Sequence, residues 1–317
     1  MKTINYIIAL LLITSYSYGQ QNSPYSHYIF NQLIINPAYA GTKQLVNINA
    51  SYSLQWAGLS GSPSTQTLSV EGPFLKSMGL GLHFINDRAG AQNQQGLFGS
   101  YSYIVRFDDQ WRLSMGLAVG VSNFTLDGTK LITESAEDPS IPTTKVNSVR
   151  FDSKAGLFLY SNRFYAGFSV TELLADVIKS KDLRVAKQIR HYYITSGYVF
   201  DAGKNLKIKP SFLFREDFKA PSTIDINLFF LIKERIWLGS SVRFGANIFK
   251  NPDLDNTLKY SNAVILMTEW NITKSLRLGY AYTMSLGALK NYSGHEIELG
   301  YTFPKKADTK MRTPRFF

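Results

Sequence analysis

The closing stretch of the chain carries the pattern that decides the fold. It begins with Leu276-Arg277-Leu278-Gly279-Tyr280-Ala281-Tyr282-Thr283-Met284-Ser285-Leu286 and resumes after a break at 290–294 with Ile297-Glu298-Leu299-Gly300-Tyr301-Thr302-Phe303. In both runs, large apolar residues alternate with small or polar ones. A period of two indicates β-strands, whose successive side chains point to opposite sides. The stretch therefore predicts a hairpin with one bulky face and one small, polar face.

The same alternation recurs along the chain, in about fourteen strand-like runs joined in sequence by turns. Their approximate spans are 43–57, 63–72, 77–87, 95–107, 110–124, 149–161, 163–174, 189–201, 205–217, 222–233, 235–248, 259–270, 274–287 and 292–304. Runs of about ten to fourteen residues suit a tilted membrane crossing better than the five or six residues usual in a soluble sheet. Within the run at 205–217, Pro210 removes a ladder donor and predicts a bulge.

The connections alternate in length. Tight turns are expected at 107–110, 160–163, 201–204, 232–235 and 271–274, and longer loops at 87–94, 125–148, 175–188, 249–258 and 287–291. Alternate turns of an up-and-down sheet lie at opposite ends, and outer-membrane barrels have short turns at the periplasmic end. The pattern predicts an all-β fold: an up-and-down antiparallel transmembrane β-barrel of about 14 strands, of outer-membrane type.

Charge decides which face meets lipid. An Arg or Lys facing lipid at the bilayer midplane costs roughly 2–4 kcal/mol, so a whole set turned outward would cost more than a domain's stability. We therefore expect the charged residues on the small, polar faces to point into the lumen. They are Arg106, Arg112, Lys207, Lys209, Arg215, Asp225, Arg243, Arg277, Glu296 and Glu298.

Composition and the N-terminal sequence limit the cellular compartments in which we expect the protein. The 317 residues carry a formal charge of +11 and no cysteine, which excludes disulfides and thiolate metal sites. Lys2, an apolar run at 4–13 and the small residues Ser17 and Gly19 form the pattern of a signal peptide cleaved near Gly19. The run is too short for a spanning helix. Because the chain is exported, its basic charge indicates anionic lipid rather than nucleic acid.

Four segments follow from these patterns: a signal peptide at 1–19, an irregular periplasmic lead-in or plug at 20–42, a β-barrel at 43–304 and a basic C-terminal tail at 305–317. The lead-in is rich in aromatic residues and does not alternate. We expect it to pack into the mouth of the barrel or against a partner. The candidate partner-binding residues of the lead-in and tail are Tyr25, Tyr28, Phe30, Asn31, Pro37, Tyr39, Arg312, Arg315, Phe316 and Phe317. For the lead-in the alternative is a plug that stabilises the barrel, and for the tail a signal for barrel insertion.

Catalytic and metal patterns are weak. The four histidines have no chelating spacing. Ser293 and His295 lie two apart near Asn291, as in a barrel lipase, but no nucleophile-elbow pattern accompanies them. The basic segment 179–187 is either a solvated loop or a contact for lipopolysaccharide phosphates. We predict no enzyme activity, catalytic residue, cofactor or metal.

Several short motifs resemble one known family. They are Tyr25-Ser26-x-Tyr28-x-Phe30-Asn31, Asn36-Pro37-Ala38-Tyr39-Ala40-Gly41, Gln55-Trp56-x-Gly58, Pro63-x-Thr65-Gln66-Thr67, Gly79-x-Gly81, Tyr160-Ser161-x-Arg163-Phe164-Tyr165-x-Gly167, Gly294-His295-Glu296-Ile297 and Arg312-Thr313-Pro314-Arg315-Phe316-Phe317. In this order they resemble the PorP/SprF family of type IX secretion proteins, across nearly all of the mature chain.

The resemblance implies a non-enzymatic outer-membrane component of type IX protein secretion that recruits machinery or cargo, such as gliding or adhesin substrates, at its periplasmic end. Expected partners are outer-membrane lipid and lipopolysaccharide, other secretion components and secreted cargo. The alternative, suggested by the basic lumen, is an outer-membrane diffusion channel for small anionic solutes.

Overall fold

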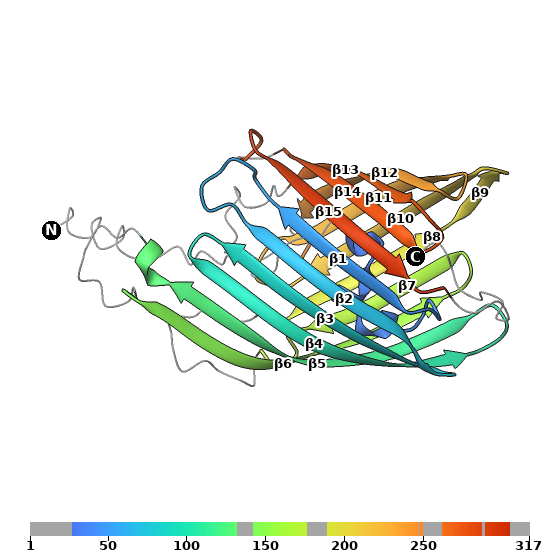
Figure 1. Ribbon diagram of the computed structural model, residues 1–317, viewed down its shortest axis with the longest axis horizontal. Coiled ribbons are helices and arrows are strands. Elements are labelled where there is room, and N and C mark those ends of the chain that lie inside the picture. The colour runs from blue at the N-terminus through green and yellow to red at the C-terminus, as the bar shows by residue number, and fades with distance from the viewer. Residues whose placement is uncertain are drawn as a thin grey trace.

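A computed structural model describes residues 27–131, 142–175, 189–246, 248–249, 262–286 and 289–304. The chain forms an antiparallel barrel that encloses a short segment near its N-terminus (Figure 1). The strands are β1 Asn47–Leu54, β2 Ser64–Leu75, β3 Met78–Ala89, β4 Gln92–Arg106, β5 Arg112–Asp127, β6 Lys145–Tyr160, β7 Phe164–Thr171, β8 His191–Tyr198, β9 Phe200–Gly203, β10 Leu206–Glu216, β11 Ser222–Ile232, β12 Ile236–Ala246, β13 Ala263–Asn271, β14 Leu276–Ser285 and β15 Ser293–Thr302.

Each strand pairs with its neighbours in sequence, and β1 pairs with β15, which closes the barrel. Strands β8 and β9 are one strand interrupted at Val199, since both pair with β10. The wall therefore has fourteen strands, and the predicted up-and-down barrel is confirmed. No helix in the described ranges has the length and apolar character to cross a membrane.

Burial alternates along the strands as the sequence predicts. On β5, Leu117 and Val119 are 63% and 69% exposed on the outer face, whereas Ser114 and Ala118 are buried inside. A continuous apolar outer surface is the property that a barrel needs in lipid. The small residues between these bulky ones leave room in the lumen.

The two ends of the barrel differ. At the short-turn end the hairpins are tight: β2–β3, β4–β5, β6–β7, β9–β10, β11–β12 and β13–β14. The chain enters β1 and leaves β15 at this same end. The other connections lie at the opposite, long-loop end. The turn at 108–111 is ordered locally, because Asp108 Oδ1 accepts hydrogen bonds from the backbone N–H groups of Gln110 and Trp111 at 2.7 and 2.6 Å. These bonds lower the pKa of the Asp108 carboxyl.

Two expectations about connections need correction. The long loop predicted at 87–94 is wrong: β3 continues to Ala89 and β4 starts at Gln92, so the two strands are joined by a two-residue turn. Sequence alone hid this, since residues 86–95 lack the apolar alternation that marks the rest of both strands. The bulge predicted at Pro210 is also wrong. The β10 ladder pairs Ser211 with Gly197 and Ile208 with Phe200, so three residues separate the two pairs on each strand and no extra residue is inserted. On its other side Pro210 pairs in register with Leu228 of β11.

A charge placed on the outer face should destabilise the barrel. We expect Leu117→Arg to cost about 2–4 kcal/mol of unfolding free energy, because the guanidinium would sit in hydrocarbon near the middle of β5. Urea unfolding in lipid vesicles measures the loss, with Leu117→Phe as the apolar control. Equal stability of the two variants would contradict the assignment of this face to lipid.

Candidate functional site

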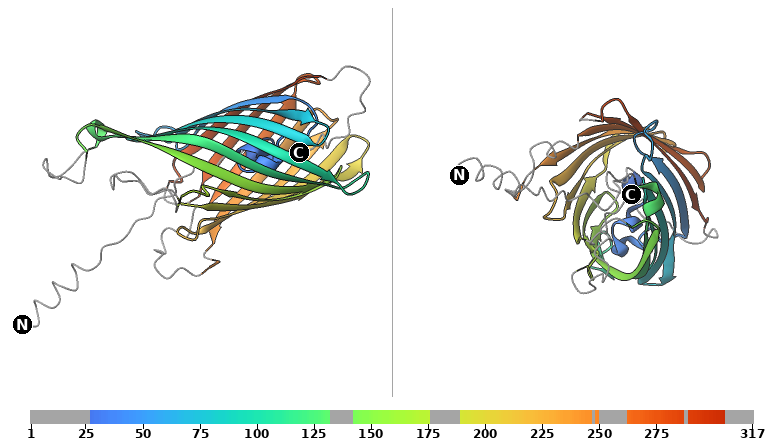
Figure 2. Two further views of the ribbon diagram at one scale, coloured as in Figure 1. Left: turned by 90° about the horizontal axis from the view of Figure 1, so that it is seen from below. Right: turned by 90° about the vertical axis from the view of Figure 1, so that its left-hand side faces the viewer.

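The lumen is filled by residues 28–42, which we call the plug (Figure 2). The plug is a chain of three short 3₁₀ helices, η1 His27–Ile29, η2 Gln32–Ile34 and η3 Pro37–Tyr39. Local chemistry sets the start of η3. The Asn36 side chain accepts a hydrogen bond from the Ala38 backbone N–H at 3.0 Å, and Pro37 occupies the first helical position. Every residue from 28 to 42 is buried, so the barrel wall encloses the whole segment.

A row of small residues across the wall receives the plug backbone. Paired positions in successive strands are occupied by glycine or serine, from β3 to β7. The row consists of Gly79, Ser102, Gly116, Gly156 and Ser169. A Cβ at Gly79 would lie 2.2 Å from the Ala40 carbonyl oxygen, and one at Gly116 would lie 2.2 Å from the Ala38 nitrogen. Side chains larger than hydrogen are therefore excluded at both positions.

Two other glycines complete the fit. A Cβ on Gly156 would lie 2.1 Å from Asn36 Oδ1. At the end of the plug, Gly41 has a φ of +71°, in the left-handed region that favours glycine, and its own Cβ would meet Gly79 Cα at 2.6 Å. The plug therefore packs closely against the backbone of the wall on the side of the barrel formed by β3–β7.

Side chains of the wall satisfy the polar backbone of the plug. Ser102 Oγ donates to the Ala40 carbonyl at 2.6 Å, and Ser169 Oγ donates to the Ile35 carbonyl at 2.7 Å. Glu71 Oε2 accepts from the Gly41 N–H at 2.7 Å. Buried backbone groups without partners would cost about 1–3 kcal/mol each. The row therefore supplies hydrogen bonds as well as space.

Plug side chains bond to the wall in the same way. Asn36 Nδ2 donates to the Leu157 carbonyl at 3.0 Å, and Asn31 Nδ2 donates to Ser69 Oγ at 2.9 Å. On the opposite wall, Asn227 Nδ2 donates to the Tyr28 hydroxyl at 3.0 Å. Contacts to β2, β6 and β11 hold the plug from several directions.

Aromatic packing fixes the two halves of the plug. The Phe30 ring meets Phe229 edge-on at 5.5 Å, and the Tyr39 ring meets Phe158 in the same way at 5.5 Å. A tyrosine hydroxyl is neutral at physiological pH, and burial raises the pKa of the Tyr28 and Tyr39 hydroxyls further above the usual value. The plug therefore brings no phenolate charge into the lumen.

Lys209 is fully buried beside the plug. Its ammonium lies 5.5 to 5.9 Å from the ring centroids of Phe30, Tyr165 and Trp237. Aromatic faces attract a cation through the negative potential of the ring. A plug residue thus helps to complete an aromatic enclosure for a charge on the wall.

Most of the predicted lumen charges point inward. Seven are buried: Arg112, Lys209, Arg215, Asp225, Arg243, Glu296 and Glu298. Arg277 is half-buried and its Nη2 donates to Asn49 Oδ1 at 2.8 Å. Arg243 and Asp225 form a two-point ion pair, with Nε and Nη2 donating to the two carboxylate oxygens at 2.8 Å each.

Two of the ten charges are exceptions. Arg106 is exposed at the short-turn end of β4, where its Nη2 donates to the Lys76 carbonyl at 3.4 Å. Lys207 is half-buried near the same end of β10 and pairs with Asp201 at 2.8 Å. Both occupy inward-facing positions in the alternation along their strands, but these positions lie at the strand ends. The alternation alone does not show how far a position lies from the barrel mouth.

Comparison with known proteins assigns the chain to a family. Residues 17–303 match the family model described as Type IX secretion system membrane protein PorP/SprF. The chain belongs to this family. No curated protein sequence matches it.

The fold of this PorP/SprF protein is that of known outer-membrane barrels. The structure of the CymD monoaromatic hydrocarbon channel matches with a TM-score of 0.50 and 9% identity, over 92% of this chain and 96% of CymD. The Acinetobacter baumannii outer membrane protein Omp33 matches with a TM-score of 0.44 and 9% identity, over 83% of this chain and 100% of Omp33. At such identity the CymD likeness shows the fold alone.

The predicted partner-binding residues divide into two groups. Tyr28, Phe30, Asn31, Pro37 and Tyr39 belong to the plug, and each is buried and close to the wall. They cannot touch a periplasmic protein while the plug is docked. Tyr25 and the four tail residues, together with the signal peptide and the basic segment 179–187, lie outside the described residues. The sequence missed the small-residue row, although its glycines and serines were visible within the strand runs.

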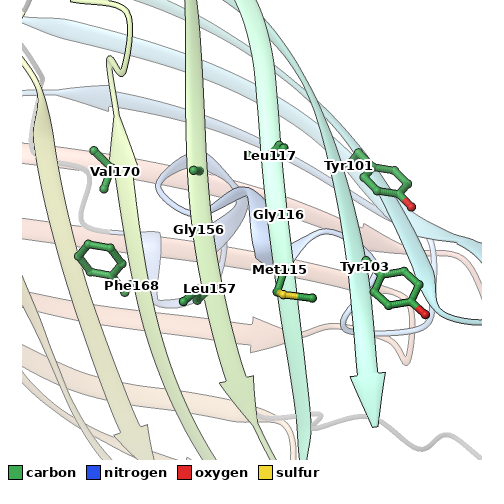
Figure 3. A pocket seen from close by; sticks show the side chains of 10 residues that line it. Tyr101, Tyr103, Met115, Gly116, Leu117, Gly156, Leu157, Phe168 and Val170 are labelled. Carbon is green, nitrogen blue, oxygen red and sulfur yellow. The ribbon is translucent and has the colours of Figure 1, made fainter.

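The outer wall carries an apolar groove of about 430 Å³ over β4–β7 (Figure 3). Its lining residues include Tyr101, Tyr103, Leu117, Ala155, Leu157 and Phe168. Gly116 and Gly156 are among its lining residues, so the groove lies on the outer side of the small-residue row. Another candidate, the Ser293–His295 pair, is 3.3 Å apart, but His295 Nδ1 faces the Tyr280 hydroxyl at 2.8 Å rather than a carboxylate. A catalytic triad needs a carboxylate or amide there to orient the imidazole.

A methyl group in the small-residue row should displace the plug. We expect Gly116→Ala to weaken docking by about 1–3 kcal/mol, because its Cβ would overlap backbone that cannot move aside cheaply. Since the chain has no cysteine, a Gln32→Cys reporter in the plug can be labelled by a maleimide without background. Labelling should accelerate in Gly116→Ala and stay slow in the control Gly99→Ala, whose added Cβ meets open space. Equal rates would contradict the docking geometry.

Removing one partner of the buried ion pair should destabilise the barrel strongly. We expect Asp225→Asn to cost about 3–5 kcal/mol, because Arg243 would remain charged without a carboxylate. The paired control, Asp225→Leu with Arg243→Met, should recover most of that loss. Urea unfolding in lipid vesicles measures both, and a stable Asp225→Asn barrel would disprove the coupling.

Proposed function

We propose that this PorP/SprF protein is a non-enzymatic outer-membrane component of type IX secretion that recruits machinery or cargo at its short-turn end, which would face the periplasm. The docked plug is the observation that carries the proposal, because it fills the lumen that a diffusion channel would need to keep open. Family membership and the arrangement of turns also support it. Cleavage near Gly19 would release the mature chain after export.

Recruitment would use the parts of the chain that meet at the short-turn end. Strand β1 begins there and β15 ends there, so the described chain leaves the barrel wall at this end, ahead of residues 305–317. We assign first contact to the tail through Arg312, Arg315, Phe316 and Phe317. The plug residues Tyr28, Phe30 and Tyr39 would contribute only if a partner draws the plug out of the lumen. Gliding adhesins are one class of cargo that would fit this role.

The channel alternative is disfavoured by the same geometry. Its support was the basic lumen, but Arg243 is neutralised by Asp225, and Lys209 is enclosed by aromatic rings. Lys154 donates to the Ile34 carbonyl at 3.2 Å and so serves the plug. These cations support the plug and the wall rather than a path for anions.

The proposal is tested by changing the tail and the plug in two separate variants. A tail variant, Arg312→Glu with Arg315→Glu, keeps the terminal phenylalanines that could signal insertion. A plug variant, Asn31→Cys with Ser69→Cys, should lock the plug to β2 on oxidation, because the two native side chains already meet. Heat-modifiable gel mobility confirms that each barrel assembles.

We expect cells that carry the tail variant to release fewer secreted proteins into the medium. We also expect fewer periplasmic proteins to co-purify with the variant. If partners also draw out the plug, the oxidised plug variant should fail in the same way and recover on reduction. Unchanged secretion in every assembled variant would refute the recruiting role.

Conductance provides a separate prediction. In planar bilayers the intact barrel should stay closed, whereas deletion of residues 28–42 should open a pore. The exposed lumen carries several cations, so anion selectivity is expected in the deletion variant. The control is the oxidised Asn31→Cys with Ser69→Cys barrel, which should stay closed. A steady anion-selective current through the intact chain would favour the channel instead.

A further inference from the structure

A small outward-facing residue helps to form the groove over β4–β7. Ala155 of β6 lies in register with Leu117 of β5 and with Val170 of β7, which both carry larger side chains. All three line the groove, together with the backbone of Gly116 and Gly156. A Cβ on either glycine would point inward to the plug, so neither position can fill the groove from the wall. The hollow of about 430 Å³ falls within the roughly 300–1,000 Å³ of sites that hold small molecules.

The groove lies within the apolar band of the outer wall. On β4 and the turn after it, the outward positions from Leu97 to Phe107 carry no charged or amide side chain, and the next outward position is Gln95. These ten residues span roughly 25 Å at about 3.3 Å per residue and a tilt of about 40°, which is the height of the apolar band in outer-membrane barrels. Tyr101 and Tyr103, which line the groove, fall inside this row. The groove therefore opens to the hydrocarbon of the membrane.

The height of the groove corresponds to one leaflet. Tyr103, Met115 and Leu157 each lie three residues from the short-turn end of their strand, and Tyr101 and Leu117 lie five residues from it. These residues are therefore roughly 8–13 Å from the short-turn ends of the strands. Half of a hydrocarbon core of about 30 Å is about 15 Å. Acyl chains of the leaflet at the short-turn end thus cover the height of the groove.

Polar groups lie toward the same end. Figure 3 shows the hydroxyls of Tyr101 and Tyr103 directed toward the end of the barrel at which β4 finishes. Tyrosines at a membrane interface place the ring in apolar surroundings and the hydroxyl among headgroups. Three residues after Tyr103, Arg106 is exposed next to the backbone of Lys76, which is exposed as well. The carboxylates at 108–109 follow on the turn, farther along the chain from the groove. The two cations match the phosphate of a lipid whose chain extends into the groove.

We propose that the groove binds one acyl chain of a phospholipid from the leaflet at the short-turn end, with the phosphate near Arg106. Lipid tails are as apolar as leucine, so the hydrophobic effect does not favour the groove over the rest of the wall. The preference comes from van der Waals contact, because a chain in a groove touches wall atoms on more sides than a chain on a convex surface.

This lipid site is separate from the recruiting role, and only the name of its leaflet depends on the orientation proposed there. With the short-turn end in the periplasm, the leaflet is the one that contains phospholipid rather than lipopolysaccharide. None of the measurements below depends on secretion, so the recruiting role can fail while the lipid site stands, and the reverse.

Photo-cross-linking tests the site with a defined probe. The purified chain is placed in phosphatidylethanolamine vesicles that contain a small share of the same lipid with a diazirine on one acyl chain. We expect Leu157 to be labelled about three- to fivefold more than Leu228, a modest preference because only packing favours the groove. The two residues are 46% and 42% exposed, and Leu228 lies on β11 at a similar height. Equal labelling would show ordinary lipid contact and overturn the proposal.

The position of the diazirine along the acyl chain tests the direction of the lipid. A diazirine near the ester should mark Met115 and Leu157, which are closer to the short-turn end. A diazirine near the terminal methyl should mark Leu117 and Val170. The opposite order would show a chain from the other leaflet and refute the assignment.

Two variants separate the groove from the rest of the wall. Ala155→Phe fills the groove, so labelling of Leu157 should fall to the level of Leu228 while the barrel keeps its heat-modifiable mobility. Ala50→Phe is the matched control, because Ala50 faces outward on β1, three residues from its short-turn end, and does not line the groove. It should leave the labelling of Leu157 unchanged. Full labelling in Ala155→Phe would place the bound chain elsewhere and overturn the proposal.

The native occupant is identified in isolated outer membranes. The chain has no cysteine, so Ala155→Cys can carry a photoreactive maleimide at a single position. We expect an adduct with the mass of a phospholipid, and less of it when the reagent is attached to Ala50→Cys. An adduct with a polypeptide or with lipopolysaccharide would identify a different occupant and refute the assignment.

Discussion

The close approach of the plug backbone to the barrel wall is the constraint on which the rest of the structure depends. A peptide inside a barrel brings polar N–H and C=O groups into a space with little water, and each must find a partner. Here the wall opposite residues 36–41 carries only glycine or serine at the paired positions of β3–β7. Glycine makes room for the backbone, and serine bonds to its carbonyls. One cross-strand row therefore provides both the room for the plug backbone and hydrogen-bond partners for its polar groups.

The plug also explains the charge inside the barrel. A basic lumen alone is compatible with an anion channel, but the buried cations have local tasks in this structure. Arg243 binds Asp225 on the neighbouring strand, Lys154 binds a plug carbonyl, and Lys209 lies among aromatic rings that include Phe30. A filled lumen agrees better with a secretion component that organises partners than with a pore for solutes. Membership of the PorP/SprF family points the same way.

The two ends of the barrel offer different kinds of surface. The short-turn end gathers the start of β1, the end of β15 and the tight hairpins, so it presents a compact base. The long-loop end is uneven, because β7 stops at Thr171 while β6 continues past it.

Sequence by itself determined the strands, their number and the face that meets lipid. These properties are local: a period of two is visible within a single run such as 276–286, and charge cannot face hydrocarbon. The inward placement of Asp225, Glu296 and Glu298 followed from the same rule. The rule failed for Arg106, because the alternation does not show how far a position lies from the barrel mouth.

Only the tertiary structure decided where residues 28–42 lie and what they touch. The small-residue row depends on the register of five strands, which brings Gly79 and Ser169 into line across positions far apart in sequence. The uneven long-loop end likewise depends on where β7 ends relative to β6. Register and strand ends are set by pairing between distant segments, so no pattern within one segment can reveal them.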